Sequence, residues 1–104
     1  MLDKIAAKKL ALNVIGRGIL VFTIDICFEK EFEYGWIFGY QSKEYLKTGK
    51  NGLGGNHPVL VDKYKERAYN VVPLLSTEEI IEVYSKYQSN EEELRKAFFF
   101  WTIP

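Results

Sequence analysis

The sequence predicts an α+β fold, with a four-stranded antiparallel sheet and with an N-terminal helix and C-terminal helices packed on one face of it. Three observations predict this class. Apolar residues recur at helical spacing near both ends of the chain, four runs of strand-forming residues lie between them, and polar turns join these runs in two pairs. Hairpin pairs build an antiparallel sheet, whose apolar face needs helices to cover it.

The length and composition are those of one small domain. A chain of 104 residues leaves no room for a second domain, so we expect residues 1–104 to form one unit, with residues 88–104 as a C-terminal helical extension. Seven Tyr, seven Phe and two Trp predict a core of large flat side chains. The chain has 14 basic and 14 acidic residues, so it lacks the excess of positive charge with which proteins bind nucleic acid without sequence preference. We therefore expect no nucleic-acid partner.

Cysteine usage and hydropathy point to the cytoplasm. Cys27 is the single cysteine, so no internal disulfide can form. Lys8 and Lys9 interrupt any secretory h-region. The apolar run over residues 19–28 contains Asp25 and is too short to cross a bilayer. We expect a cytoplasmic protein with no membrane partner.

A helix is predicted over residues 3–14, because Leu2, Ala6 and Leu10 recur at four-residue steps. The first strand follows after two glycines. Its alternating apolar positions are Phe22, Ile24, Ile26 and Phe28. A charged connection over residues 29–33 is expected to turn the chain back as a hairpin.

The second strand has an aromatic row on one face. Its members are Tyr34, Trp36, Phe38 and Tyr40. We expect this row to pack on a helix, and Trp36 is better explained as a core residue than as a binding anchor. Gly35 and Gly39 on the opposite face indicate close approach of other backbone or of a ligand, or a plain bend.

A short helical turn is predicted over residues 42–48. Ser42 is its expected N-cap and Gly49 its stop, with Tyr45 and Leu46 directed inward.

A loop rich in glycine and asparagine, residues 50–57, separates this turn from the second hairpin. Pro58 begins the third strand, where its missing N–H fits a first or edge position. A polar turn over residues 63–66 leads to a fourth strand over residues 67–72, which Pro73 ends.

Two helices are predicted at the C-terminus. Ser76 and Glu79 form a capping box, and Asn90 and Glu93 repeat the pattern. The apolar stripe of the last helix consists of Leu94, Ala97, Phe98 and Trp101. Residues 99–100, both Phe, interrupt this amphipathic pattern, so we expect the tail to be covered on more than one side.

Catalytic and ligand-binding patterns are weak. Cys27 and His57 could form a nucleophile–base pair only by meeting in space, and no nucleophile motif surrounds the cysteine. One His and one Cys do not assemble a zinc site. The glycine-rich segment over residues 52–58 lacks the Lys-Ser/Thr of a phosphate loop and leads into a strand. We expect no catalytic residue, cofactor or metal.

The acidic residues of the C-terminal helices are the best candidates for a partner-binding role. Exposed carboxylates at Glu78, Glu82 and Glu92 would steer a protein partner that has a basic cleft. A solvated helix face is the alternative explanation.

Two segments, residues 35–40 (GWIFGY) and residues 55–62 (GNHPVLVD), together with Tyr45 and Gly49, resemble the immunity protein 35 family, also called YrhB-like. The signature residues are Trp36, Phe38, Tyr40, Tyr45, Gly55, Asn56, Pro58 and Val61. The resemblance extends over residues 35–87 and includes a similar closing helix.

The resemblance implies a small α+β bacterial protein that neutralises a toxin encoded beside it, without catalytic residues. The partner is then a cognate toxin. The residues expected to bind it are Asn56, His57, Glu78, Glu82 and Glu92. Two departures are the turn over residues 63–67, which lacks the family's usual glycine, and residues 72–74, where the family commonly has a Gly-Thr segment.

The tail beyond Tyr87 has no counterpart in this resemblance. Exposed aromatic residues there would favour a homodimer through the C-terminal aromatic helix. They also support an alternative function, a small heat-stable chaperone that holds unfolded clients through apolar surface around Phe99, Phe100 and Trp101.

Overall fold

The computed structural model describes residues 1–15, 24–50, 58–71 and 75–98. Its elements in chain order are α1 (Lys4–Ile15), β1 (Ile24–Phe32), β2 (Gly35–Ser42), α2 (Lys43–Thr48), β3 (Val59–Asp62), β4 (Arg67–Asn70), α3 (Thr77–Tyr87) and α4 (Glu91–Phe98). The strands form one sheet in the order β1-β2-β3-β4, and all neighbours are antiparallel. The predicted α+β class and the four-stranded antiparallel sheet are confirmed.

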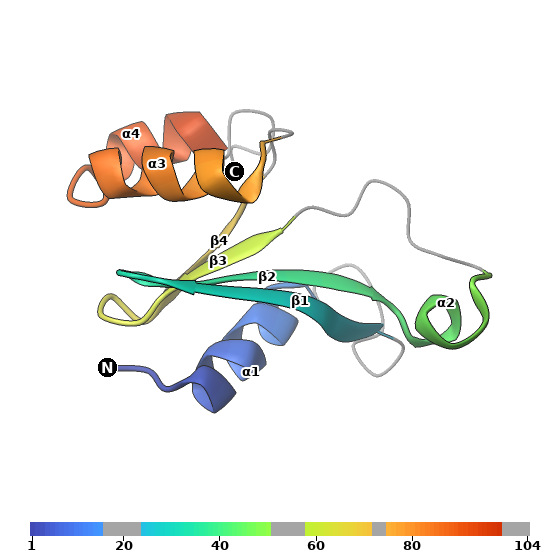
Figure 1. Ribbon diagram of the computed structural model, residues 1–104. Helices are drawn as coiled ribbons and strands as arrows, with labels where there is room; N and C mark the ends of the chain where they lie inside the picture. The colour runs from blue at the N-terminus through green and yellow to red at the C-terminus, as the bar shows by residue number, and fades with distance from the viewer. Residues whose placement is uncertain (16–23, 51–57, 72–74, 99–104) are drawn as a thin grey trace.

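The helices lie on both faces of the sheet, which corrects the expectation that they share one face. Figure 1 shows α1 below the sheet and α3 and α4 above it. The reason is visible in β3, where every position is buried. Val59 and Val61 belong to the core under α1, whereas Leu60 belongs to the core under α3 and α4. A strand that is apolar on both faces needs cover on both.

The core under α1 is built around the aromatic row of β2. Trp36 and Phe38 are buried and stacked, with ring centroids 6.5 Å apart, and they pack against Ala7 and Ala11 of α1. This part of the expected row therefore packs on a helix. Tyr34 does not join it, because it lies in the turn before β2 and its ring contacts the core on the opposite face.

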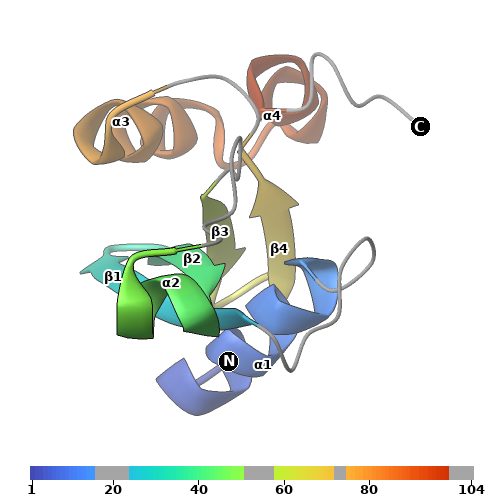
Figure 2. The ribbon, with the colours of Figure 1, turned by 90° about the vertical axis from the view of Figure 1, so that its right-hand side faces the viewer.

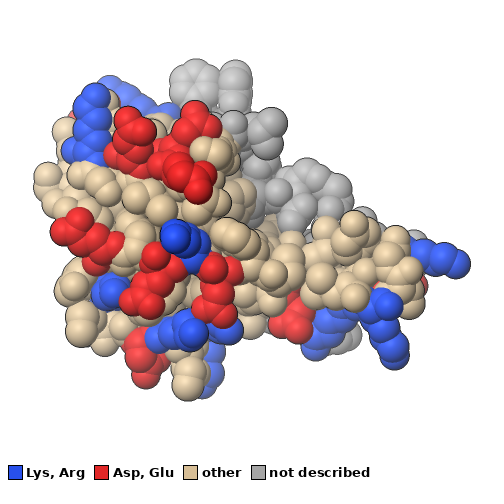
Figure 3. Space-filling view, viewed as in Figure 1, with Lys and Arg blue, Asp and Glu red and all other residues tan. Residues whose placement is uncertain are grey.

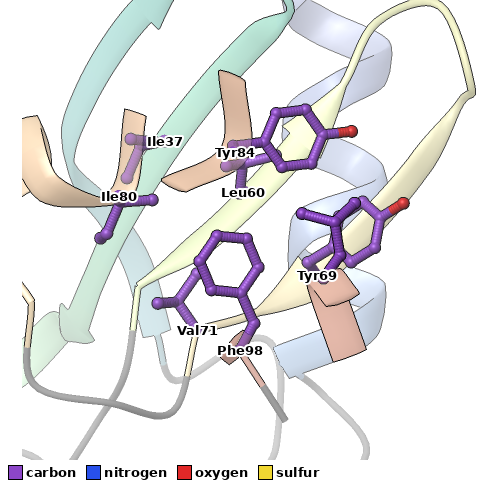
Figure 4. Packing of buried hydrophobic residues seen from close by; sticks show 8 residues of the cluster. Ile37, Leu60, Tyr69, Val71, Ile80, Tyr84 and Phe98 are labelled. Atoms are coloured by element: carbon purple, nitrogen blue, oxygen red, sulfur yellow. The ribbon is translucent and has the colours of Figure 1, made fainter. Parts of the chain in front are cut away.

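The core under α3 and α4 is the larger of the two. Its buried members are Ile37, Leu60, Tyr69, Val71, Ile80, Tyr84, Leu94 and Phe98. The rings of Tyr84 and Phe98 stack with centroids 6.3 Å apart, so α3 and α4 meet the sheet through one aromatic layer (Figure 4). Because Leu94 and Phe98 are fully buried, α4 is an integral part of the core.

A β-bulge in β1 changes which side chains share a face. Ile26 pairs with Tyr40, but Phe28 pairs with Gly39, so Cys27 is the extra residue. Phe28 therefore lies on the face opposite Ile26, and the predicted four-residue apolar face is wrong at this position. The expected charged connection is also wrong, because residues 29–32 continue the strand.

Gly35 allows a close approach between β2 and β3. A Cβ atom built on it would lie 1.8 Å from the carbonyl oxygen of Val61, a distance no side chain can adopt. The prediction of close backbone approach is thus confirmed at this glycine. At Gly39 the corresponding atom would be 3.2 Å from Cβ of Phe28, so the bulged strand packs directly over it.

The predicted caps of α2 are present. Ser42 Oγ accepts a hydrogen bond from the Tyr45 amide at 3.0 Å, and Gly49 ends the helix with φ of 76°. The inward direction predicted for Tyr45 and Leu46 is wrong, since they are 45 % and 48 % exposed. No residue of α2 is buried, because the helix extends past the end of the sheet (Figures 1 and 2).

The capping box of α3 is confirmed. Ser76 Oγ accepts from the Glu79 amide at 3.1 Å, and Glu79 accepts from the Ser76 amide at 2.9 Å. In α4, Asn90 Oδ1 accepts from the Glu93 amide at 3.3 Å.

The fourth strand, Arg67–Asn70, ends earlier than expected. Predictions for Phe22, for most of the glycine-rich loop, for Pro73 and for the aromatic tail after Phe98 lie outside the described residues.

Candidate partner-binding surface

Asp62 is a buried carboxylate that links the second hairpin to α3. It is 1 % exposed, and its Oδ1 accepts from the amides of Tyr64 and Lys65, each at 2.8 Å. Its Oδ2 accepts from the Tyr84 hydroxyl. Burial and the hydrogen bond to Asp62 raise the pKa of Tyr84 above its ordinary value. All three contacts hold the fold together, so this carboxylate is structural.

Glu91 links α4 to β4 in a similar way. One carboxylate oxygen accepts from Arg67 at 2.7 Å, the other accepts from the Tyr69 hydroxyl at 2.9 Å, and Lys65 lies 3.8 Å away. Burial would raise the pKa of Glu91, but the hydrogen bonds from Tyr69 and Arg67 outweigh it and lower that pKa. Burial, with the bond to Glu91, raises the pKa of Tyr69 to about 12.

Most other acidic residues of α3 and α4 also have partners within the chain. Glu79 belongs to the capping box, and the hydrogen bonds from the backbone and side chain of Ser76 lower its pKa. Glu92 and Glu93 each lie 3.7 Å from Lys96. Glu92, one of the predicted binding residues, is nevertheless 80 % exposed in its side chain.

Within α3 and α4, Glu78 and Glu82 are the acidic residues that make neither an ion pair nor a side-chain hydrogen bond in the described part of the chain. Both are exposed and stand four positions apart on α3, so their side chains are neighbours on one helix face. We call this pair the α3 acidic row. Figure 3 shows acidic side chains gathered over α3 and α4. Unpaired, exposed carboxylates attract a cationic surface, and they are the part of the predicted site that the structure brings together.

Other predicted site residues are dispersed or undescribed. Gly55, Asn56 and His57 lie outside the described residues, so the Cys27–His57 pair has no geometry to assess. Cys27 itself is exposed at the bulge of β1.

The described segments contain no group of three His, Cys, Asp or Glu residues that could hold a metal ion. No helix among them is long and apolar enough to span a membrane.

The residues singled out as family signature mostly serve the fold. Trp36, Phe38 and Val61 are buried, and the Pro58 carbonyl accepts from the Val71 amide at 2.9 Å. Tyr40 is half-buried and Tyr45 is exposed.

A second charged group, which the sequence patterns did not predict, lies on and beside α2. Lys43, Lys47 and Lys50 are exposed, and none has an ion-pair partner in the described segments. Their spacing, four residues from Lys43 to Lys47 and three from Lys47 to Lys50, is visible in the sequence, but the sequence does not show whether they have ion-pair partners within the chain.

Comparison with known proteins finds a family model and a relative that match this chain. Residues 4–86 match the family model described as immunity protein 35. An uncharacterized protein, YrhB of Escherichia coli strain K12, is 29 % identical over 78 residues, which cover 73 % of this chain and 74 % of that protein. No solved structure matches.

Proposed function

Because the chain belongs to the immunity protein 35 family, we propose that it is a non-catalytic immunity protein that binds and neutralises a cognate bacterial toxin in the cytoplasm. The observation that carries the proposal is the match over residues 4–86, which includes all of the sheet and most of α3. The name of the family supplies the class of partner, a toxin.

The α3 acidic row is the proposed contact. Glu78 and Glu82 have carboxylates that are exposed and not neutralised within the described part of the chain, so they are available to a cationic surface on the toxin. Glu92 would extend the contact onto α4, and Asn56 and His57 are further proposed contacts. Binding would block the toxin sterically and electrostatically, with no bond made or broken.

Co-expression tests this function. The toxin domain encoded beside this gene is expressed in bacteria with and without the protein, and colony counts are compared. We expect growth only when the protein is present. Equal killing in both strains would contradict the proposal, provided that blotting shows both proteins at the same level.

The chaperone alternative and a homodimer through the C-terminal aromatic helix have no support in the described residues. Both depend on Phe99, Phe100 and Trp101, which lie outside them, and the preceding aromatic residue, Phe98, is buried in the core. We therefore propose the immunity function in preference to these two.

A further inference from the structure

Helix α2 is capped at both ends by local hydrogen bonds and contacts the sheet through β1 and β2. Its six residues are too few for a stable isolated helix, and none of them is buried. Ser42 caps its first turn and Gly49 its last, and the Thr48 hydroxyl donates to the Glu44 carbonyl at 2.9 Å. A helix fixed in this way presents its side chains to the surroundings in one arrangement.

The exposed side chains of α2 are of two kinds. Tyr45 and Leu46 are large and apolar, and about half of each is exposed. Lys43 and Lys47 are four positions apart, so their ammonium groups form a basic row on the helix. We call this pair the α2 basic row, and Lys50 lies just beyond it.

The α3 acidic row matches the α2 basic row in spacing and opposes it in sign. Both rows have an i,i+4 separation, which places the Cβ atoms about 5–6 Å apart on each helix. Ile81 and Val83, which flank Glu82, are half-buried and leave apolar surface beside the carboxylates. This surface can receive Tyr45 and Leu46 while the charged rows pair.

The two rows cannot meet within one molecule. Acidic side chains gather over α3 and α4, whereas α2 projects at the far end of the molecule, where basic side chains lie along the outer edge (Figures 1 and 3). The two rows can meet between two molecules. A twofold axis that brings α2 of one copy to α3 of the other makes the reverse contact at the same time, so each interaction occurs twice.

We propose that this surface binds a second copy of the chain, and that the protein forms an antiparallel twofold dimer in which each α2 basic row faces the α3 acidic row of the partner. The dimer does not rest on the proposed toxin binding, although both use the α3 acidic row. It has one consequence for toxin binding, because Glu78 and Glu82 are covered in the dimer and the toxin must compete for them.

Sedimentation velocity of the purified full chain tests the dimer. Exposed ion pairs are weak individually and are screened by salt. We therefore expect a concentration-dependent dimer at about 20 mM salt, where the Debye length is roughly 20 Å, and dissociation at about 0.5 M salt, where it is about 4 Å. A protein that stays monomeric in low salt up to about 1 mM, where an association of about 4 kcal/mol is half complete, would overturn the proposal.

Charge reversal identifies the surfaces. K43E/K47E and E78K/E82K each place like charges opposite one another, and each is expected to weaken self-association at least about tenfold. Mixing the two variants restores opposite charges at both contacts, so the mixture should form a heterodimer. K9E/K30E changes the net charge by the same amount as K43E/K47E at exposed positions on α1 and β1, and it should dimerise normally.

Circular dichroism confirms that each variant is folded before sedimentation. A mixture that stays monomeric, or a K9E/K30E variant that is as weak as K43E/K47E, would overturn the assignment of these rows even if the native chain is a dimer.

Discussion

At the scale of single residues, Asp62 is the polar group on which the fold depends most. Its carboxylate is buried and accepts from two turn amides and from the Tyr84 hydroxyl. Removing it takes the acceptor from two part-buried turn amides and from the buried Tyr84 hydroxyl, and a donor that loses its acceptor in a buried site is costly. The residue thus fixes the β3–β4 turn and the position of α3 together.

We predict that Asp62→Ala lowers the free energy of unfolding by about 3 kcal/mol or more, because two amides and a hydroxyl lose their acceptor. Tyr84→Phe removes only one of these bonds and should cost about 1–2 kcal/mol. Urea unfolding followed by tryptophan fluorescence measures both. Equal losses in the two variants would show that the turn amides find other acceptors.

Glu66 ends the same turn in a conformation that favours glycine. Its φ is 55°, and it is the single non-glycine residue with positive φ in the described segments. The resemblance noted in the sequence predicts a glycine in this turn, and the backbone identifies position 66 as the one with positive φ. The ion pair of Glu66 with the N-terminal ammonium, at 3.2 Å, is exposed and adds little.

Glu66→Gly should therefore stabilise the protein by up to about 1 kcal/mol, because it relieves the left-handed conformation. Glu66→Ala removes the same ion pair but keeps the Cβ atom, and it should give no gain. Thermal unfolding at a fixed scan rate compares the two. A Glu66→Gly variant less stable than Glu66→Ala would contradict this explanation.

Local chemistry could be predicted from the sequence, whereas the direction of exposed side chains could not. Ser42, Gly49 and the Ser76–Glu79 box act through neighbours one to four positions away, so their spacing is sufficient. The direction of Tyr45 depends on whether another element covers α2, and that is set by the length of the sheet.

At the scale of elements, the bulge in β1 explains the main difference between expected and observed strands. A pattern of period two assumes an unbroken register, and one extra residue moves all following side chains to the opposite face. After Cys27, Glu29 and Glu31 lie on the α1 side, where Glu29 pairs with Lys4 and Lys8 at 3.4 and 3.3 Å. The charged residues 29–32, expected to form a connection, therefore belong to the exposed part of an edge strand, where charged residues are common.

Helix α4 is joined to β4 through Glu91, and this contact makes stability depend on pH. The folded-state pKa of Glu91 lies below its ordinary value of 4.5, because the bonds from Tyr69 and Arg67 outweigh burial. A lowered pKa contributes stability that is present above about pH 4.5 and is lost as the pH falls through the folded-state value. We predict that Glu91→Gln flattens the loss of stability between pH 5 and pH 3, measured by urea unfolding. A slope equal to that of the native chain would contradict the role of Glu91.

At the scale of the whole molecule, two layers of helices enclose one sheet, and α4 completes the upper layer. The family match ends at residue 86, yet Leu94 and Phe98 of α4 are fully buried against the sheet and α3. The part of the chain that resembles the family is therefore not sufficient for the core.

Truncation after Gln88 should unfold the protein or leave it without cooperative unfolding, because it removes Leu94, Phe98 and Glu91 at once. The milder change Phe98→Ala should cost about 3–5 kcal/mol, as large core truncations of Phe do. Arg95→Ala, on the exposed side of the same helix, should change stability by less than about 0.5 kcal/mol. Circular dichroism and urea unfolding compare the three, and a truncated chain with a native unfolding transition would contradict this role of α4.

The order of elements could be predicted because each has its own local signal, but which helices cover which face of the sheet could not. The run over residues 59–61 is apolar at every position, and such a run indicates burial on both sides. The two sets of helices could be assigned to their faces only after the pairing of Trp36 with Val61 and of Ile37 with Leu60 was known.

The central claim is that the protein neutralises a toxin through the α3 acidic row, and its most direct test is the affinity of the purified chain for the toxin domain. Isothermal titration calorimetry compares the native chain with Glu82→Lys and with Glu33→Lys, a matched change at an exposed position in the β1–β2 turn. We predict that Glu82→Lys weakens binding at least about tenfold and Glu33→Lys by far less. Equal affinity of all three chains, or no binding by the native chain, would contradict the claim.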